Sequence, residues 1–325
     1  MKKGFSLRVI IALFVMAALL LCAGLAVSAD NPPAVVKSGF CGAEGNEENV
    51  TYTLYDDGTC VISGTGDMED QRVSYNGFSY APWVNDVPEE YTVTSVIIEE
   101  GVTGIGAYSF SYTREISQIS IPSTVTHIGS YAFRDCKGLK NISIPSGVTE
   151  IPFAAFMGCT SLSGVDIPDT VTAIAGSAFE GCSSLKGIKL PSGLTEIGMA
   201  AFQNCTALER ITIPQGVTSV GHKAFNNCAN LAEIYIPDTV VTVGSEAFDN
   251  TAWIENRPGG PLYTGRVLYS AKFLTAADAN LVIRPGTTAI MEDCFYRGNE
   301  EAKAIVTSIS IPASVSALPQ YVFSE

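Results

Sequence analysis

The sequence has very little of what most active sites need. Histidine occurs only twice in 325 residues, at His127 and His222, and no Cys-x-x-Cys pair is present. One histidine in each of two distant repeats cannot supply a zinc site that needs at least three protein ligands. A Gly-x-Ser-x-Gly elbow is also missing, so a serine nucleophile is not predicted. We therefore expect no metal, no cofactor and no catalytic residue in this chain.

Positive charge is also scarce. The chain has 19 Lys and Arg against 33 Asp and Glu, a formal net charge of −14. An acidic surface repels nucleic acid and anionic lipid headgroups, so we expect no nucleic-acid partner. Only 16% of the residues are charged and 46% are hydrophobic, which is ample for a large core. With 33 carboxylates, a hydrolase that uses a pair of them is an alternative that composition leaves open.

The first 29 residues have the features of a secretory signal peptide. Lys2, Lys3 and Arg8 precede an apolar run over residues 9–21, and small residues before Asp30 offer a cleavage site. A retained membrane anchor is the alternative, because the apolar run is on the long side. Cleavage would remove the three basic residues and take the formal charge from −14 to −17. The sequence predicts export and no membrane span in the mature chain.

A repeat of 23 residues fills the middle of the chain. An apolar residue followed by proline recurs at this step, at Ile121, Ile144, Ile167, Leu190, Ile213 and Ile236. A phenylalanine follows twelve residues after each, at Phe133, Phe156, Phe179, Phe202, Phe225 and Phe248. A cysteine comes three residues after the first five phenylalanines, at Cys136, Cys159, Cys182, Cys205 and Cys228. A fixed period of this length predicts a solenoid.

Each repeat has about six apolar positions, which it can bury only by stacking on its neighbours. Ile142 and Ile144 share one face of a short strand, which Pro145 ends because proline lacks an N–H group. Equivalent strands stack about 4.8 Å apart, so the phenylalanines should form an aromatic column in the core. The cysteines should form a column of free buried thiols. The alternatives are a ligand pocket lined by the phenylalanines, an array of metal-binding cysteines, and disulfides. Each of them explains a residue that recurs in every turn less well than a core position does.

The residue before each cysteine indicates the conformation of the turn. It is always glycine, asparagine or aspartate, the residues that tolerate a positive φ, so we predict a left-handed residue there. The position is held by Asp135, Gly158, Gly181, Asn204, Asn227 and, in the sixth repeat, Asn250. A second position holds glycine in four repeats and Pro152 in another. Because proline fixes φ at a negative value, we expect the glycines there to allow close packing rather than a positive φ. Its glycines are Gly129, Gly198, Gly221 and Gly244.

The regions that flank the repeats have a different character. Residues 30–92 are predicted to be a linker and a small β cap, because residues 50–55 and 59–62 alternate around an Asp-Asp-Gly turn as a β-hairpin does. Cys41 and Cys60 in this cap could form a disulfide in an exported chain, and the sequence leaves this open. Repeats occupy 93–250, an insertion with a second hairpin occupies 251–282, and repeats resume over 283–325 with the C-terminal cap missing.

These motifs resemble the BspA-type leucine-rich repeat proteins, a class of bacterial surface and secreted proteins with 23-residue repeats. The shared motif is Leu-x-x-Ile-x-Ile-Pro, then Val-Thr-x-Ile-Gly, then Ala-Phe-x-x-Cys, and it is clearest from Leu208 to Cys228. The resemblance covers residues 94–325, and the cap and the interruption from Trp253 to Tyr269 also look like those of the family. It implies a curved β-rich solenoid, roles in adhesion, host-protein binding or cell–cell contact, and no catalytic residues to transfer.

One outward position in each strand changes from repeat to repeat, while the apolar pair around it hardly varies. Along the stack it holds Ser120, Ser143, Asp166, Lys189, Thr212 and Tyr235. Solenoids often use such a strand face for recognition, so we predict a ligand-binding column with Tyr235 as its best anchor. The plainer interpretation is a solvated face on which Asp166 and Lys189 pair across strands.

The sequence therefore favours a non-enzymatic module, secreted or held at the bacterial cell surface, that binds a protein or glycan ligand. A structural spacer within a larger surface protein is the first alternative. A carboxylate-dependent hydrolase is the second and less favoured one.

Overall fold

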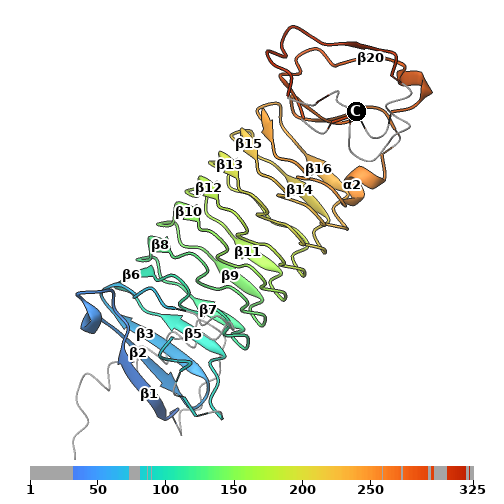
Figure 1. The fold of residues 1–325 in the computed structure, drawn as a ribbon. Coiled ribbons are helices and arrows are strands. Elements are labelled where there is room, and N and C mark those ends of the chain that lie inside the picture. Colours follow the sequence, from blue (N-terminus) through green and yellow to red (C-terminus); the bar gives the residue numbers. More distant parts are fainter. Residues whose placement is uncertain are drawn as a thin grey trace, which may run out of the picture.

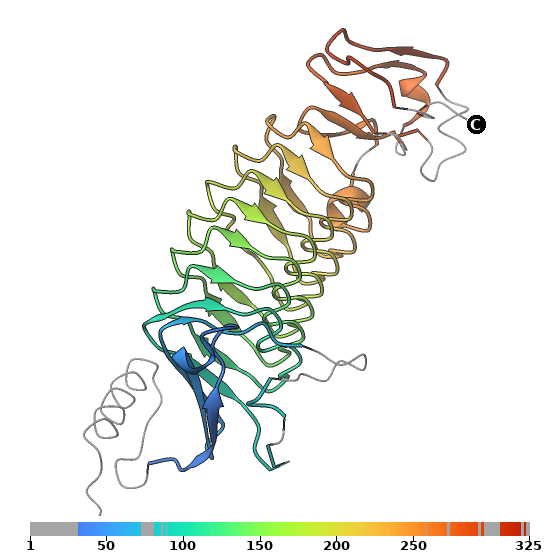
Figure 2. The same cartoon turned by 60° about the vertical axis from the view of Figure 1, so that its left-hand side comes forward.

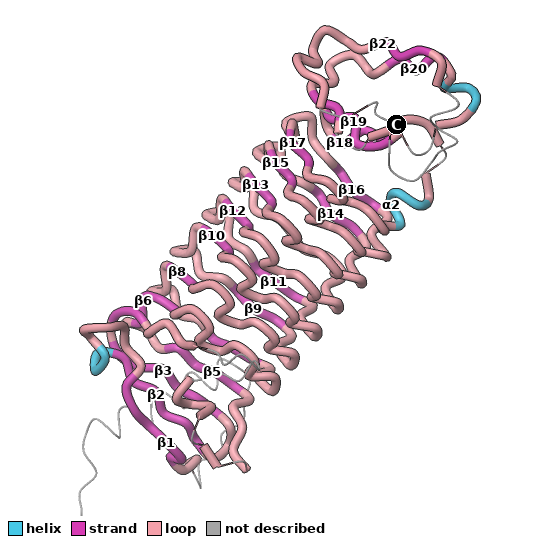
Figure 3. Tube along the Cα trace, viewed as in Figure 1, coloured by secondary structure: helices cyan, strands magenta, loops and turns pink. Residues whose placement is uncertain are grey.

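A computed structural model describes residues 32–72, 81–85, 87–88, 90–257, 259–271, 274–291, 294–295, 306–319 and 322. The predicted signal peptide and the last repeat phenylalanine, Phe323, lie outside these residues. Coils of 23 residues stack along one axis from a β cap at the N-terminal end to a β region at the C-terminal end (Figures 1 and 2). Figure 3 shows short strands joined by long loops and very little helix. The predicted β-rich solenoid is confirmed.

The cap is a small antiparallel sheet that continues into the first coil. Its strands are β1 (Val35–Phe40), β2 (Val50–Tyr55) and β3 (Thr59–Gly64), with a single 3-10 turn η1 (Glu47–Asn49) between the first two. β2 and β3 form the predicted hairpin. β3 then pairs in parallel with β5 (Ser95–Ile98), so the cap covers the open edge of the first coil. Cys41 and Cys60 are both buried free thiols, and the disulfide that the sequence left open is not formed.

The first side of each coil contains the strand that precedes proline. Its strands are β5, β7 (Gln118–Ser120), β9 (Asn141–Ser143), β11 (Gly164–Asp166), β14 (Arg210–Thr212) and β16 (Glu233–Tyr235). They are hydrogen-bonded in pairs: β5 with β7, β9 with β11 and β14 with β16. Among the described residues no ladder joins β7 to β9 or β11 to β14, and residues 187–189 in the coil between are not a strand.

The second side is more regular. Here β4 (Gly66–Asp67) leads into β6 (Val102–Ile105), β8 (His127–Ile128), β10 (Glu150–Ile151), β12 (Ala173–Ile174), β13 (Glu196–Ile197), β15 (Ser219–Val220) and β17 (Thr242–Val243). The last five form one continuous parallel sheet. The threonines directly before β8, β12, β13 and β15 add hydroxyl bonds to the preceding coil, as when Thr195 Oγ1 donates to the Thr172 carbonyl at 3.1 Å. The four glycines at the predicted position after β8, β13, β15 and β17 pack closely, as predicted: a Cβ on Gly198 would lie 2.6 Å from the carbonyl carbon of Ala175.

The third side consists of turns that bond coil to coil. Alternate N–H groups donate to the next coil, as those of Tyr131, Phe133 and Asp135 do to the carbonyls of Phe153, Ala155 and Met157, at 2.7–3.0 Å. Two residues in each turn have a positive φ. One is the position before cysteine, where φ lies between 56° and 75° in all six predicted residues, which confirms that prediction. The other lies four residues earlier and was not predicted. Its residues are Tyr108, Tyr131, Ala154, Ser177, Ala200, Lys223 and Glu246.

Asn204→Val is expected to destabilise the protein by about 2–4 kcal/mol. Asn204 has φ of 61°, where a β-branched residue is strained by about 1–3 kcal/mol. Its Oδ1 also accepts a bond from Asn227 Nδ2 at 3.1 Å, which valine cannot replace. Thr212→Val, on an exposed strand position, is the control and should be nearly neutral. Urea unfolding of both variants measures the difference, and equal losses would contradict the conformational argument.

The phenylalanines form the predicted column in the core. Rings from Phe110 to Phe248 are fully buried and stack with centroids 5.3–5.6 Å apart and planes within 10° of parallel. Trp83 covers the first ring at 5.3 Å, and Trp253 covers the last at 5.5 Å. The cysteines form a second buried column, and each thiol bonds a phenylalanine carbonyl, as Cys159 Sγ does to the Phe133 oxygen at 3.1 Å. The prediction of free core thiols is confirmed.

The region after the last regular coil continues the core. A short helix α2 (Ala252–Glu255) leads into an antiparallel hairpin of β18 (Leu262–Thr264) and β19 (Val267–Ser270). After a 3-10 turn η2 (Ala276–Asp278), the chain forms β20 (Asn280–Val282), β21 (Ala289–Ile290) and β22 (Ser308–Ser310). The backbone N–H of Phe248 donates a hydrogen bond to the Tyr269 hydroxyl of the hairpin at 3.1 Å. In the earlier coils, a carbonyl oxygen of the next coil accepts the equivalent bond. Its ring also meets the last phenylalanine edge-on.

Candidate functional site

The six residues of the predicted binding column are all exposed on the first side of the coils: Ser120, Ser143, Asp166, Lys189, Thr212 and Tyr235. The expected strand face is not one continuous sheet. The ladder is interrupted after Ser120 and after Asp166, and Lys189 belongs to no strand. The continuous sheet lies on the second side instead.

The suggested pairing of Asp166 with Lys189 is also wrong, since no ion pair joins them in the described part of the chain. The charge of Lys189 acts on a different carboxylate. The pKa of Asp169 is lowered first by hydrogen bonds from the backbone and hydroxyl of Ser192 and then by Lys189. The exposed column is therefore not locked by an internal salt bridge.

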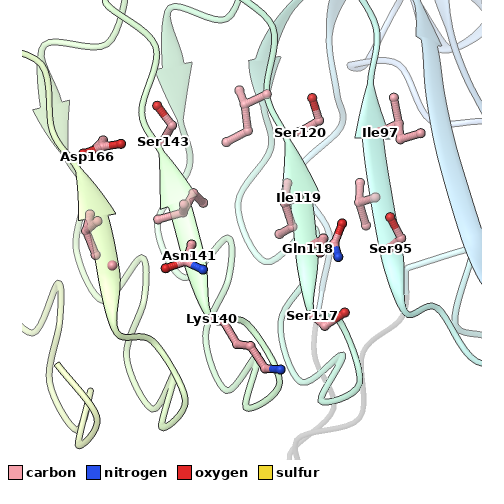
Figure 4. Close-up of a pocket in the computed structure, with 15 residues that line it drawn as sticks. Ser95, Ile97, Ser117, Gln118, Ile119, Ser120, Lys140, Asn141, Ser143 and Asp166 are labelled. Atoms are coloured by element: carbon pink, nitrogen blue, oxygen red, sulfur yellow. The ribbon is translucent and has the colours of Figure 1, made fainter. Parts of the chain in front are cut away.

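A groove of about 710 Å³ runs over β5, β7, β9 and β11 (Figure 4). It lies where the ladder between β7 and β9 is interrupted. Figure 4 shows hydroxyl and amide side chains standing along the strands, with Lys140 at one end and Asp166 at the far strand. The polar residues that line it include Ser95, Gln118, Ser120, Asn141, Ser143 and Asp166. Its floor is apolar, because Ile119 and Val165 are only partly covered.

The groove brings together three of the six predicted residues and leaves out the other three. Ser120, Ser143 and Asp166 line it. Tyr235, which is 54% exposed, lines a separate pocket of about 230 Å³ near the hairpin, while Lys189 and Thr212 line neither. The predicted column therefore contributes to two recesses rather than to one continuous surface.

Apart from Tyr235, the smaller pocket is built from residues that were not predicted as site residues. Arg284 lies over the ring of Tyr263, 4.7 Å from its centroid, and donates its backbone N–H to the Tyr263 hydroxyl at 2.9 Å. Trp253 is held from one side by Arg257, whose guanidinium lies 5.0 Å from its ring. Tyr235 accepts a bond from Gln215 Nε2 at 3.2 Å. The signal that could have found them is the concentration of aromatic and arginine residues after Asn250.

The described residues include both histidines and eight of the nine cysteines, all free thiols. No group of three or more metal-ligating side chains occurs there. His127 is exposed and 3.7 Å from Asp67, whereas His222 is half-buried against the Ser245 hydroxyl at 2.6 Å. Burial raises the pKa of the column thiols, which keeps them neutral and unreactive at pH 7. No helix in the described residues is long and apolar enough to span a bilayer.

Comparison with solved structures finds bacterial leucine-rich repeat proteins. A leucine-rich repeat protein of T. pallidum is 27% identical, with 61% of this chain and 84% of that chain covered and a TM-score of 0.46. One from Eubacterium ventriosum is 18% identical, with 88% and 94% covered and a TM-score of 0.46. A leucine-rich cell surface protein of Faecalibacterium prausnitzii is 25% identical, with 91% and 93% covered and a TM-score of 0.38. No curated protein matches the chain.

The family assignment rests on the repeats themselves. The model of the BspA type leucine rich repeat region matches residues 89–166 and 149–257, in six copies. Together these matches span just over half of the chain, and they include every coil in which the phenylalanine and cysteine columns were observed. The chain therefore belongs to the BspA-type leucine-rich repeat family.

Proposed function

We propose that this chain is a non-enzymatic module, exported to the cell surface or secreted, that binds a protein or glycan ligand in the groove over β5, β7, β9 and β11. The observation that carries the proposal is the groove itself. It is open, it crosses four strands, and it combines an apolar floor with neutral hydroxyl and amide groups. Such groups both donate and accept hydrogen bonds, so they suit the backbone of an extended peptide or the hydroxyls of a glycan.

The dimensions of the groove support a ligand that runs along the stack. Four strands about 4.8 Å apart span about 14 Å, the length of about four extended residues. Ser120 and Ser143 face outward between apolar residues, and Asn141 and Gln118 occupy the equivalent place two residues earlier in their strands. A ligand there would meet a repeated pattern of polar groups, which is how repeat proteins read extended partners.

The test is a binding screen followed by a groove variant. The mature chain from residue 30 is screened against immobilised host matrix proteins and an array of bacterial glycans. Combining Gln118→Ala, Asn141→Ala and Asp166→Ala should weaken binding of the selected ligand at least about tenfold, because each buried polar group of the ligand that loses its partner costs about 1–3 kcal/mol. The thermal midpoint should hardly change, since all three side chains are on the surface.

The matched control removes side chains from the same strand positions further along the stack. Arg210→Ala, Thr212→Ala and Glu233→Ala lie outside the groove and should leave binding unchanged. If the control weakens binding as much as the groove variant does, the groove is not the site. If only Tyr235→Ala weakens binding, the ligand occupies the smaller pocket. A folded chain that binds nothing in the screen would favour the structural spacer.

A further inference from the structure

A second surface lies on the third side of the coils, away from the groove. Tyr108, Tyr131, Phe153 and Met199 occupy neighbouring positions of successive turns, with Gly176 between the last two; we call these four residues the aromatic ridge. The rings of Tyr108 and Tyr131 stack with centroids 4.6 Å apart and planes 9° from parallel. Phe153 meets Tyr131 edge-on at 5.3 Å. Phe153 and Met199 are 39% and 53% exposed, high values for such apolar side chains.

The tyrosines of this side stand in a backbone conformation that bulky residues rarely adopt. Tyr108, Tyr112 and Tyr131 have φ of 56°, 61° and 59°. Later coils place Ala154 and Ser177 at the position of Tyr131, so the turn itself does not require an aromatic residue. Bulky side chains at strained positions tend to mark functional surfaces. The tyrosines therefore add something to this surface that folding does not need.

Arg134 fixes the charge of the surface. Its guanidinium lies between two rings, 5.2 Å from the centroid of Tyr112 and 5.6 Å from that of Tyr131. Its Nε is buried and lies 3.5 Å from a carboxylate oxygen of Asp135, which also faces Lys137 at 4.0 Å. Arg114 is exposed beside them, and no ion pair reaches it within the described part of the chain. A chain of net charge −14 thus has a locally basic edge here.

The geometry favours a protein over a sugar or a small molecule. The facing sides of the stacked tyrosines cover each other and Arg134 covers Tyr112, so few ring faces are free for a sugar to stack on. Small-molecule sites are concave, whereas this surface is a row of side chains on the turns. Tyrosine and arginine are the residues that dominate protein interfaces, and exposed methionine adapts to an apolar partner.

We propose that the aromatic ridge and Arg134 form a docking surface for a protein partner that presents an apolar side chain flanked by carboxylates. The apolar side chain would contact Phe153 and Met199, and the carboxylates would meet Arg134 and Arg114. A symmetric dimer would place this basic edge against the same basic edge of a second copy, which argues against a two-fold contact through the ridge. This surface is distinct from the groove on the first side, so the proposal does not depend on the groove ligand.

The test uses a phage-displayed library of random 12-residue peptides as the probe and the mature chain as the target. The ridge variant combines Tyr131→Ser, Arg134→Gln and Phe153→Ser. Each new residue already stands at the same place in another coil, as Ser177, Gln203 and Ser130, so the variant should fold. Phe40→Ser, on the N-terminal cap and 56% exposed, is the control for loss of an exposed aromatic elsewhere.

The proposal expects selected peptides that contain Asp or Glu beside an apolar residue. Their affinity should fall about 30-fold in the ridge variant, the size of a hot-spot loss, and stay unchanged in Phe40→Ser. Binding should also weaken at high salt, since charges on this rim are screened. A thermal unfolding curve checks folding, and if the triple variant is unfolded, Arg134→Gln and Phe153→Ser are measured singly.

Three results would overturn the proposal. If the library yields no acidic peptide, or yields peptides that bind the ridge variant as well as the wild-type chain, the proposed protein partner is excluded. Binding on a glycan array that the ridge variant abolishes would assign the surface to a sugar. Sedimentation that shows a dimer of the mature chain, lost in the ridge variant, would make the surface a contact between two copies.

Discussion

Phe179→Ala is expected to destabilise the protein by about 3–5 kcal/mol, the usual cost of removing a buried aromatic ring. Phe179 is fully buried and stacks on Phe156 at 5.4 Å and on Phe202 at 5.3 Å. The coils above and below cannot close the cavity, because backbone hydrogen bonds at Ser177, Phe179 and Gly181 hold them at a fixed spacing. Urea denaturation of the variant and the wild-type chain measures the loss.

Phe153→Ala is the matched control, since Phe153 has the same side chain in the same part of a coil but is 39% exposed. Its loss should stay near about 1 kcal/mol, most of it from the edge-on contact with Tyr131. Equal losses at the two positions would mean that the ring column is not the main source of stability. A loss at Phe179 confined to local opening of two coils would instead show that the stack unfolds in parts, as repeat proteins can.

The ring column and the thiol column were predictable because their periodicity is strict. A residue that recurs at every step of 23 has to occupy the same place in every coil. The left-handed residue before cysteine was predictable for a chemical reason, since only glycine, asparagine and aspartate appear there. In these positions the residue type and the backbone requirement agree.

The second left-handed position was not predictable, because the residue types there conceal it. Tyr131, Ala154, Lys223 and Glu246 are not residues that favour a positive φ, yet all four have φ between 52° and 59°. The coil-to-coil hydrogen bonds of the third side impose the conformation and outweigh the local preference. Tertiary structure rather than propensity sets the backbone at this position.

The interruptions of the first-side ladder were also hidden from the sequence. The alternation of apolar and polar residues says which side chains face out, but not whether neighbouring strands come close enough to bond. Gly164 and Gly187 share one outward position, and glycine weakens a strand because it has no side chain to pack. Residues 187–189 are the ones that form no strand. The groove crosses one of these interruptions, and the pocket at Tyr235 depends on Trp253, Tyr263 and Arg284 from outside the regular coils, so only the exposure of the six column residues could be foreseen.

The protein is expected to lose stability steeply between about pH 8.5 and pH 12, because its thiols ionise only when it unfolds. Burial raises the pKa of Cys41, Cys228 and Cys294 to about 12 in the folded chain. The unfolded chain ionises its thiols from about pH 8.5 and therefore loses protons first. The stabilisation is complete below about pH 8.5 and is lost as the pH rises toward the folded value.

Raising the pH from 7.5 to 9.5 should lower the free energy of unfolding by about 1.4 kcal/mol for each of these three thiols, or by about 4 kcal/mol for the three together. Urea unfolding with a reductant present, at the two pH values, measures the loss. The control combines Cys228→Ala and Cys294→Ala, and its loss over the same interval should be about 3 kcal/mol smaller than that of the wild-type chain. Because each chain is compared with itself at pH 7.5, the packing cost of the substitutions cancels. An identical loss in both chains would show that these thiols have the same pKa in the folded and the unfolded chain.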